Sequence, residues 1–253
     1  AIGAVIVPAV MEKEYSAVSF LILAASQFRE VRNVERATLG AMESTEMVKR
    51  GTAYIEGIAR VFEARNYLAI WAALGVAIVS EVFSGAILWR IAVCAAAGAV
   101  MVLLLSQLMR GQRIGDIADV ELTKLQFDEA LLKVEDTVLM NVGLPSARSV
   151  YRERGLAAKI IPKGPNAKAT LANLGQMQAI AHDVSSMVGV YMDVGEQEFI
   201  PMVRRNPASG CLYIVMVPSE DDQDAFLTAI RHVPVLEGAV RKPLTSVAGK
   251  MMD

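Results

Sequence analysis

The clearest pattern in the chain is an apolar stretch from Tyr67 to Met109, in which only Glu81 and Arg90 are charged. Two strongly apolar halves are separated by a short polar stretch at residues 81–85. As a single helix the stretch would be about 64 Å long, roughly twice the ~30 Å thickness of the hydrocarbon core of a bilayer. The pattern therefore predicts two transmembrane helices joined by a turn, which together form a hairpin.

Both predicted transmembrane helices are rich in small residues, with Gly75 in the first and Gly98 in the second. Small residues let helix backbones approach closely, and helix association in lipid depends on that close approach. We expect Gly75 and Gly98 to lie at packing surfaces within the hairpin or between subunits, and Gly85 to lie in the turn. The alternative is a buried hairpin at the centre of a large soluble assembly.

Basic residues on either side of the hairpin indicate an orientation. Arg60 and Arg65 precede the first helix and Arg110 and Arg113 follow the second, whereas the turn side offers only Arg90. By the positive-inside rule, both termini are expected on the cytoplasmic side and the short turn outside. The localisation predicted from this pattern is integral to a membrane, namely a bacterial inner membrane.

The N-terminal region, residues 1–66, is predicted to be helical. Ala17–Phe28 is an apolar run too short to cross a bilayer, which favours a packed core helix or, alternatively, a helix on the membrane surface. From Glu30 to Asn66, apolar residues recur at spacings of three, four or seven, with charges between them. This pattern predicts one long amphipathic helix, or two joined near Gly51, that needs a partner helix.

The stretch that follows the hairpin, residues 110–146, is predicted to be an amphipathic helical linker. Apolar residues recur from Asp116 to Met140 with acidic residues between them, which we interpret as a helix that extends the second transmembrane helix. Gly143 and Pro145 then mark a loop.

The remainder, residues 147–253, is predicted to be a small α+β module with the order βαββαβ of a ferredoxin-like fold. The predicted fold class is therefore a membrane-anchored α+β protein, with a mostly helical N-terminal half, a transmembrane hairpin and this C-terminal module. In chain order, the predicted elements are strand Leu156–Ile161, helix Ala167–Met192, strands Glu198–Val203 and Cys211–Val217, a helix from Ser219 to about His232, and strand Glu237–Lys242.

The overall charge excludes one class of partner. The formal net charge is −2, so the chain has no global positive field for nucleic acid, and no nucleic-acid partner is predicted. The predicted partners are the lipid bilayer and other membrane or peripheral protein subunits, in a homo- or hetero-oligomer.

Glu81 and Arg90 are the strongest candidates for a role within the membrane. Ionisable groups at membrane depth are costly and often functional. These two flank the predicted turn, so they form either an ion pair at the membrane interface or part of an ion or proton pathway.

Other polar residues give weaker signals. His182 and Asp183 lie on a predicted helix without a metal-ligand companion three or four residues away, which favours a solvated or hydrogen-bonded pair. Four basic residues form a candidate contact surface for acidic lipid or a partner protein, although solvated loop charges are the alternative. These residues are Arg204, Arg205, Arg241 and Lys242.

The sequence contains no nucleophile elbow, dinucleotide-binding glycine motif, Walker sequence or Cys/His cluster. We therefore predict that the protein is not an enzyme and has no catalytic residues, no cofactor and no metal site.

The function expected from these features is that of a structural or assembly subunit of a multiprotein bacterial membrane complex. A membrane anchor joined by helices to a ferredoxin-like module resembles, in architecture, subunits of bacterial secretion, pilus and conjugation machines. The alternative is a subunit of a transporter or channel with Glu81 and Arg90 at the pathway. That alternative requires oligomerisation, because two transmembrane helices cannot enclose a pore alone.

Overall fold

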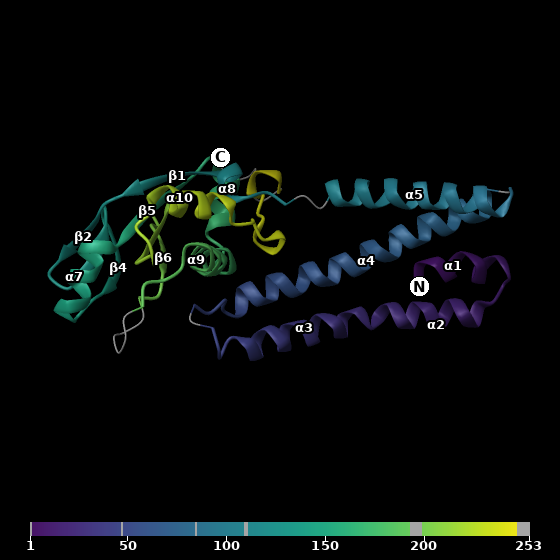
Figure 1. The fold of residues 1–253 in the computed structure, drawn as a ribbon, viewed down its shortest axis with the longest axis horizontal. Coiled ribbons are helices and arrows are strands. Elements are labelled where there is room, and N and C mark those ends of the chain that lie inside the picture. The colour runs from purple at the N-terminus through teal and green to yellow at the C-terminus, as the bar shows by residue number, and fades with distance from the viewer. Residues whose placement is uncertain (1, 47, 84, 109–110, 193–198, 247–253) are drawn as a thin grey trace. The chain divides into compact units, whose positions relative to one another are not determined.

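The computed structural model describes residues 2–46, 48–83, 85–108, 111–192 and 199–246 of the chain. Their contacts divide the chain into two compact units, whose elements are labelled in Figure 1. The helical unit comprises residues 1–38 and 58–110, and the sheet unit comprises residues 39–57 and 111–253. Each unit is therefore assembled from two separate pieces of sequence.

The described elements of the helical unit are all helices. Two short apolar helices come first, a more polar helix follows, and the two longest helices come last. The end of the third helix and the start of the fourth belong to the sheet unit. The five helices are α1 (Ile2–Met11), α2 (Tyr15–Ser26), α3 (Phe28–Met42), α4 (Thr52–Val82) and α5 (Ile87–Leu108).

The two long helices α4 and α5 are long and apolar enough to cross a membrane, as the apolar stretch predicted. Helix α5 has 22 residues and is therefore about 33 Å long. In the most apolar 18-residue window of each helix, 6% of the residues of α4 and 0% of those of α5 are buried. The connection between them lies between Val82 and Ile87, close to the predicted turn.

The predicted amphipathic region forms two helices, α3 and α4, separated near Gly51, as one of the two alternatives had it. The two helices pack together through an aromatic contact and an ion pair. The ring centroids of Phe28 and Tyr67 are 5.9 Å apart, and Arg32 Nη1 lies 3.4 Å from Glu63 Oε2. Because these contacts occur in opposite order along the two sequences, α3 and α4 are antiparallel.

The apolar run Ala17–Phe28 forms most of α2 and the start of α3. No described side chain of α2 is buried within the chain. A packed core helix is therefore not confirmed for the side chains that the structure describes in this run, and those of Phe20, Ala24 and Ala25 lie outside that set.

The sheet unit contains two antiparallel sheets. The larger has the strand order β1-β5-β7-β6, and the smaller has the order β2-β3-β4. The strands are β1 (Ala118–Thr123), β2 (Leu125–Asp128), β3 (Leu131–Val134), β4 (Thr137–Asn141), β5 (Leu156–Pro162), β6 (Met202–Arg205) and β7 (Leu212–Met216). The helices are α6 (Ile114–Ile117), α7 (Pro145–Arg154), α8 (Pro165–Leu171), α9 (Leu174–Val188) and α10 (Gln223–His232), with 3₁₀ turns η1 (Glu237–Ala239) and η2 (Pro243–Thr245).

The helix predicted from Asp116 to Met140 is wrong, because most of this segment forms strands β1 to β4. Burial alternates along these strands with a period of two: Ala118 and Val120 are buried, whereas Asp119 and Glu121 are exposed. The tight turns after β2 and β3 place Glu129 and Glu135 at positive φ (54° and 50°) without a glycine. The usual sequence signal of a hairpin is therefore missing.

The predicted ferredoxin-like module is not confirmed. The expected last strand, Glu237–Lys242, begins with the 3₁₀ turn η1 and forms no strand. The position beside β5 is taken instead by β1, which pairs with β5 from Ala118↔Pro162 to Thr123↔Ala157. The edge of β5 is thus closed by a strand that precedes the module in the sequence.

The central strand β7 lies in the core of the sheet unit, and all five of its residues are buried. Tyr213 and Val215 belong to a core cluster with Leu132 and Val134 of the small sheet. Successive side chains of a strand point to opposite faces, so the intervening residues, such as Ile214, face the other side, where α9 and α10 pack. The larger sheet is therefore covered on both faces.

Candidate functional site

The candidate site lies within the sheet unit, where the described residues of the segment 43–57 (43–46 and 48–57) pack against α9. Gly51 adopts a positive φ of +79°, and a Cβ at this position would clash with the Gln178 side chain. A Cβ on Gly175 would lie 2.9 Å from the backbone oxygen of Ala53. The absence of a side chain at these two glycines therefore allows the backbone of the segment to approach α9 closely.

Tyr54 is the residue of this segment that makes the most hydrogen bonds to α9. Its backbone N–H donates to Oε1 of Gln178 (3.3 Å), and its hydroxyl donates to Oδ1 and Oδ2 of Asp183 (2.9 and 3.1 Å). The side chain is buried, with 8% of the residue exposed. Both ends of Tyr54 are thus fixed by side chains that come from one helix.

His182 connects Asp183 to the other end of the segment. Its Nδ1 lies 3.0 Å from Asp183 Oδ1, and its Nε2 lies 3.4 Å from Glu46 Oε2. Glu46 forms a further ion pair with Arg50, four residues along the sequence. The result is a continuous row of polar groups, Arg50–Glu46–His182–Asp183–Tyr54, which we call the polar row.

The electrostatics of the polar row keep Glu46 and Tyr54 in defined protonation states. The hydrogen bond from Arg50 lowers the pKa of Glu46 below its ordinary value, and the charges of Arg50 and His182 act in the same direction. Burial raises the pKa of Tyr54 above its ordinary value, and the Asp183 carboxylate raises it further. At neutral pH Glu46 is therefore ionised, whereas Tyr54 stays neutral and can donate its hydroxyl proton.

The cavity beside the polar row is small. It measures about 280 Å³ and is lined by Glu46, Val48, His182, Ser185 and Ser186, among others. Pockets for small ligands usually measure roughly 300–1,000 Å³. Among the residues that the structure describes, no group of three His, Cys, Asp or Glu side chains could hold a metal ion. The arrangement is suited to holding residues 43–57 in place.

The predicted membrane residues lie in the helical unit. Arg90 Nη2 donates to Ser80 Oγ (3.0 Å) and lies 3.9 Å from Glu81 Oε1, so the two predicted charges form an ion pair next to the turn. A Cβ on Gly98 would lie 3.4 Å from Val76, and a Cβ on Gly75 would clash with Met101. Both glycines thus lie where α4 contacts α5.

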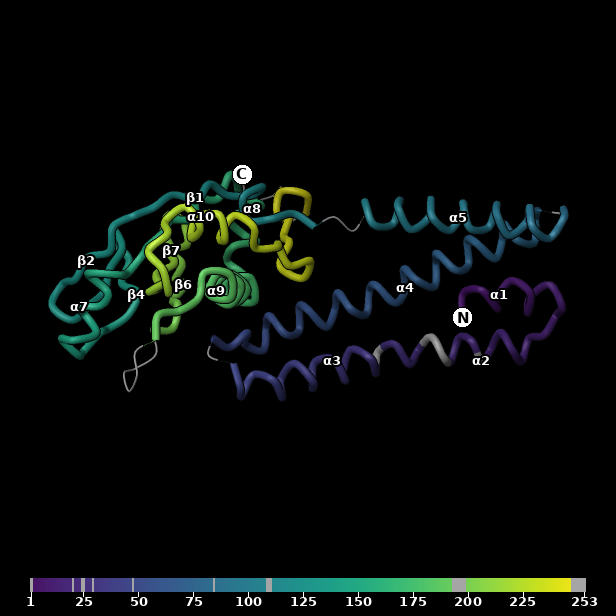
Figure 2. The backbone as a smooth tube through the Cα atoms, in the orientation of Figure 1, coloured from purple at the N-terminus to yellow at the C-terminus, as the bar shows by residue number. Residues whose placement is uncertain are grey.

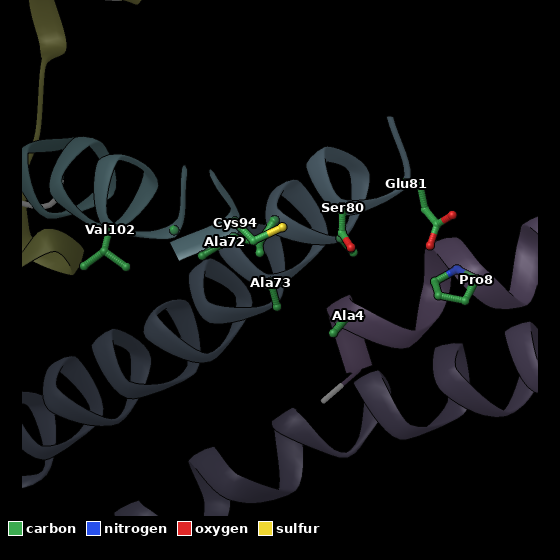
Figure 3. A pocket seen from close by; sticks show the side chains of 11 residues that line it. Ala4, Pro8, Ala72, Ala73, Ser80, Glu81, Cys94 and Val102 are labelled. Atoms are coloured by element: carbon green, nitrogen blue, oxygen red, sulfur yellow. The ribbon is translucent and has the colours of Figure 1, made fainter. Parts of the chain in front are cut away.

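Gly85 lies in the connection between α4 and α5 and is exposed. A cavity of about 530 Å³ opens between α1, α4 and α5, as Figure 3 shows. Ala4 and Pro8 of α1 line it together with Ser80 and Glu81 of α4. Its remaining lining consists of Ala, Val, Gly and Cys side chains.

The four basic residues of the predicted contact surface lie on two different parts of the sheet unit, and hydrogen bonds hold the side chains of Arg204 and Arg241. Arg204 Nε donates to the backbone oxygen of Leu139 on β4 (3.3 Å). Arg241 Nη1 donates to the backbone oxygens of Gly238 and Val240. Arg204 and Arg205 lie on β6, whereas Arg241 and Lys242 lie between η1 and η2.

The polar row was not predicted as a site from the sequence. His182 and Asp183 were interpreted as a local pair, because no ligand lies one turn away on their helix. Their partners Glu46 and Tyr54 come from a segment separated by more than 120 residues, and no spacing rule connects the two.

Comparison with known proteins gives one family and one curated relative. The model of the YIEGIA protein family matches residues 1–246. Over 242 residues, the chain is 40% identical to the uncharacterized protein YphB of Bacillus subtilis (strain 168), covering 96% of this chain and 80% of that protein. No solved structure matches the chain. The letters of the family name are the one-letter codes of residues 54–59, which begin with Tyr54 of the polar row.

Replacing Tyr54 by Phe is expected to destabilise the sheet unit by about 1–3 kcal/mol, because the partly buried carboxylate of Asp183 loses its hydroxyl donor. Thermal unfolding of the purified full chain measures the change. Tyr15→Phe is the control, since Tyr15 is 70% exposed and its loss of a hydroxyl should leave the melting temperature unchanged. Equal melting temperatures for Tyr54→Phe and wild type would contradict the assignment.

The ion pair of Glu46 predicts a pH dependence. Since the folded pKa of Glu46 is lowered, its charge stabilises the folded state above the ordinary value of 4.5, and this contribution is lost as the pH falls through the folded pKa. The difference in melting temperature between wild type and Glu46→Gln should therefore be constant above about pH 6 and shrink below about pH 4.5. A difference that grows on acidification would show that the sign is wrong.

Proposed function

The chain belongs to the YIEGIA protein family, and we propose that it is a non-enzymatic structural subunit of a bacterial membrane complex. In this proposal α4 and α5 anchor the protein in the bilayer. The sheet unit then makes the contacts with other protein subunits.

The exposed apolar surface of α4 and α5 is the observation that carries the proposal. Burying a large apolar side chain contributes about 1.5–3 kcal/mol, so leaving a dozen of them in water would cost on the order of 20 kcal/mol. That exceeds the whole folding stability of an ordinary domain, about 5–15 kcal/mol. The exposed side chains are Tyr67, Trp71, Ile78, Val82, Ile87, Leu88, Trp89, Ile91, Val100, Val102, Leu103 and Leu104.

The lengths of the two helices support a bilayer as the environment. Helix α5, at about 33 Å, matches a hydrocarbon core of ~30 Å. The apolar part of α4, residues 67–82, is about 24 Å long. The turns of α4 that precede it are polar. Tyr67 and Trp89 lie near opposite ends of the apolar segments, where aromatic side chains favour the membrane interface.

The connectivity of the chain supports two crossings. The residues before the hairpin, up to Gly57, and those after it, from Gly111, belong to the same compact sheet unit. An anchor that leaves one folded unit and returns to it crosses the bilayer an even number of times. With the basic residues that flank the hairpin, the proposal places the sheet unit on the cytoplasmic side of a bacterial inner membrane.

The sheet unit offers a groove suited to protein contact. It measures about 440 Å³ and lies between β4, α7 and the stretch around residue 200. Leu144 and Ile200 line it and are 54% and 46% exposed. The polar row, by contrast, already makes its contacts within the chain, between residues 46–54 and α9.

The alternative of a transporter or channel pathway has less support. Arg90 already pairs with Glu81 and with the hydroxyl of Ser80, so the two charges neutralise each other at the turn. The ferredoxin-like order, on which the likeness to secretion, pilus and conjugation subunits depends, is not confirmed. The proposal therefore names a structural subunit and no particular machine.

Alkaline carbonate extraction of membranes tests the anchor. The full chain should stay in the membrane pellet, because α4 and α5 are held by acyl chains. Val100→Arg, near the middle of α5, should reduce the retained fraction, since a charge there costs about 2.5–3.5 kcal/mol. Leu244→Arg, on an exposed residue of the sheet unit, is the matched control and should not change it. Complete release of the wild-type chain would overturn the anchor.

Native mass spectrometry of gently solubilised membranes tests the role in a complex. The expected result is a discrete assembly that contains the 27.3-kDa chain together with further copies or other chains. Detection of the single chain alone, under conditions that preserve known membrane complexes of the same cells, would contradict the structural-subunit proposal.

A further inference from the structure

We propose that α1 and α2 form a second apolar hairpin, which enters the bilayer beside α4 and α5 and contacts lipid acyl chains directly. This inference rests on the proposed membrane anchor and extends it, because neither helix is long enough to cross a membrane. At 10 and 12 residues, α1 and α2 are about 15 and 18 Å long, roughly half the ~30 Å hydrocarbon thickness.

The charges of this region are confined to its turn and to the helix that follows. Neither α1 nor α2 contains a charged residue. The turn between them, residues 12–14, reads Glu-Lys-Glu, and Lys13 adopts a positive φ of 59° there. Within the turn, Glu14 donates its backbone N–H to the oxygen of Ala9 (2.9 Å). Figure 2 shows the chain reversing at this point.

The outer surface of the two helices is apolar. Val10 and Met11 on α1 are 51% and 68% exposed, and Ile22 and Leu23 on α2 are 66% and 63% exposed. The hydroxyl of Ser19 donates to the backbone oxygen of Tyr15 within its own helix (3.0 Å), so this group needs no water. A surface of this kind fits hydrocarbon better than water.

Helix α1 lies against the apolar part of α4. A Cβ on Gly3 would clash with the backbone oxygen of Ile70, so the two backbones are in direct contact there. Further along α1, Pro8 lines the same cavity as Ser80 and Glu81 (Figure 3). Helix α1 therefore runs in the same direction as α4, and its charged turn lies toward the end of α4 that carries Glu81.

The polar borders of the two hairpins occur in the same order along the helices, which points to lipid as the occupant of this surface. At one end, the charged turn at residues 12–14 follows a helix whose Pro8 lines the same cavity as Glu81. At the other end, Phe28 contacts Tyr67 where both apolar segments stop, and Arg32 pairs with Glu63 just beyond. A bilayer favours charged residues only at the borders of the apolar segments within it, whereas a partner protein imposes no such rule. The apolar face of α1 and α2 is also continuous with that of α4.

Tryptophan quenching by brominated lipid tests direct contact with acyl chains. Trp71→Phe with Trp89→Phe removes both tryptophans of the chain. Single tryptophans are then introduced as Val5→Trp, Ile22→Trp, Leu103→Trp or Leu244→Trp in the full chain. Each variant is reconstituted into phosphatidylethanolamine–phosphatidylglycerol vesicles whose acyl chains are brominated or not. Thermal unfolding checks that each variant is folded.

The inference expects bromination to quench the emission at positions 5 and 22 as strongly as at position 103 on α5. Emission at position 244, on the sheet unit, should be unaffected. If position 103 is quenched but position 5 or position 22 is not, the second hairpin is overturned and the anchor stays intact. Absence of quenching at position 103 would overturn the anchor and, with it, the inference that depends on it.

Discussion

The hydrogen bonds from Tyr54 to Gln178 and Asp183 join two pieces of the sheet unit that the sequence separates by 124 and 129 residues. Between these pieces the chain makes the whole of the apolar hairpin. The sheet unit can therefore be complete only if both ends of the hairpin return to it. Gly51 and Gly175 make this possible, because a side chain at either position would hold the segment away from α9.

A second constraint acts on the larger sheet. Strand β7 is buried on both faces, so its neighbours on either side must be present for the backbone of β5 and β7 to be fully paired. Strand β1 closes the edge of β5 along six residue pairs. The small sheet then covers one face, and Glu135 in its second turn accepts a hydrogen bond from the hydroxyl of Tyr213 (2.6 Å) and from Lys159 Nζ (2.7 Å).

The features that could be predicted from the sequence are those with a local signal. The apolar segments of α4 and α5 and the strands β5 and β7 are continuous apolar runs. Such a run can be recognised from its own residues, without knowledge of what it packs against. Strands β1 to β4 were missed, because their acidic residues and glycine-free turns resemble the surface of an amphipathic helix. The polar row could not be predicted, because a hydrogen bond between Tyr54 and Asp183 produces no pattern of residue spacing in either segment. The pairing of Glu81 with Arg90 was one of two stated alternatives, and the structure shows this ion pair (3.9 Å). The other alternative, an ion or proton pathway, stays a prediction.

The division of the sheet unit into two pieces also has a consequence for its synthesis. Residues 39–57 leave the ribosome well before α9 exists, and at roughly 5–20 residues per second the wait for Asp183 is on the order of ten seconds. During that interval the chain makes the whole of the apolar hairpin, while Tyr54 has no partner on α9. Closure of so long a loop makes the contact order of this unit high, and folding correspondingly slow. In the proposed membrane anchor, insertion of the hairpin and completion of the sheet unit would therefore be coupled in time, because the segment around Tyr54 has no partner until α9 has been made.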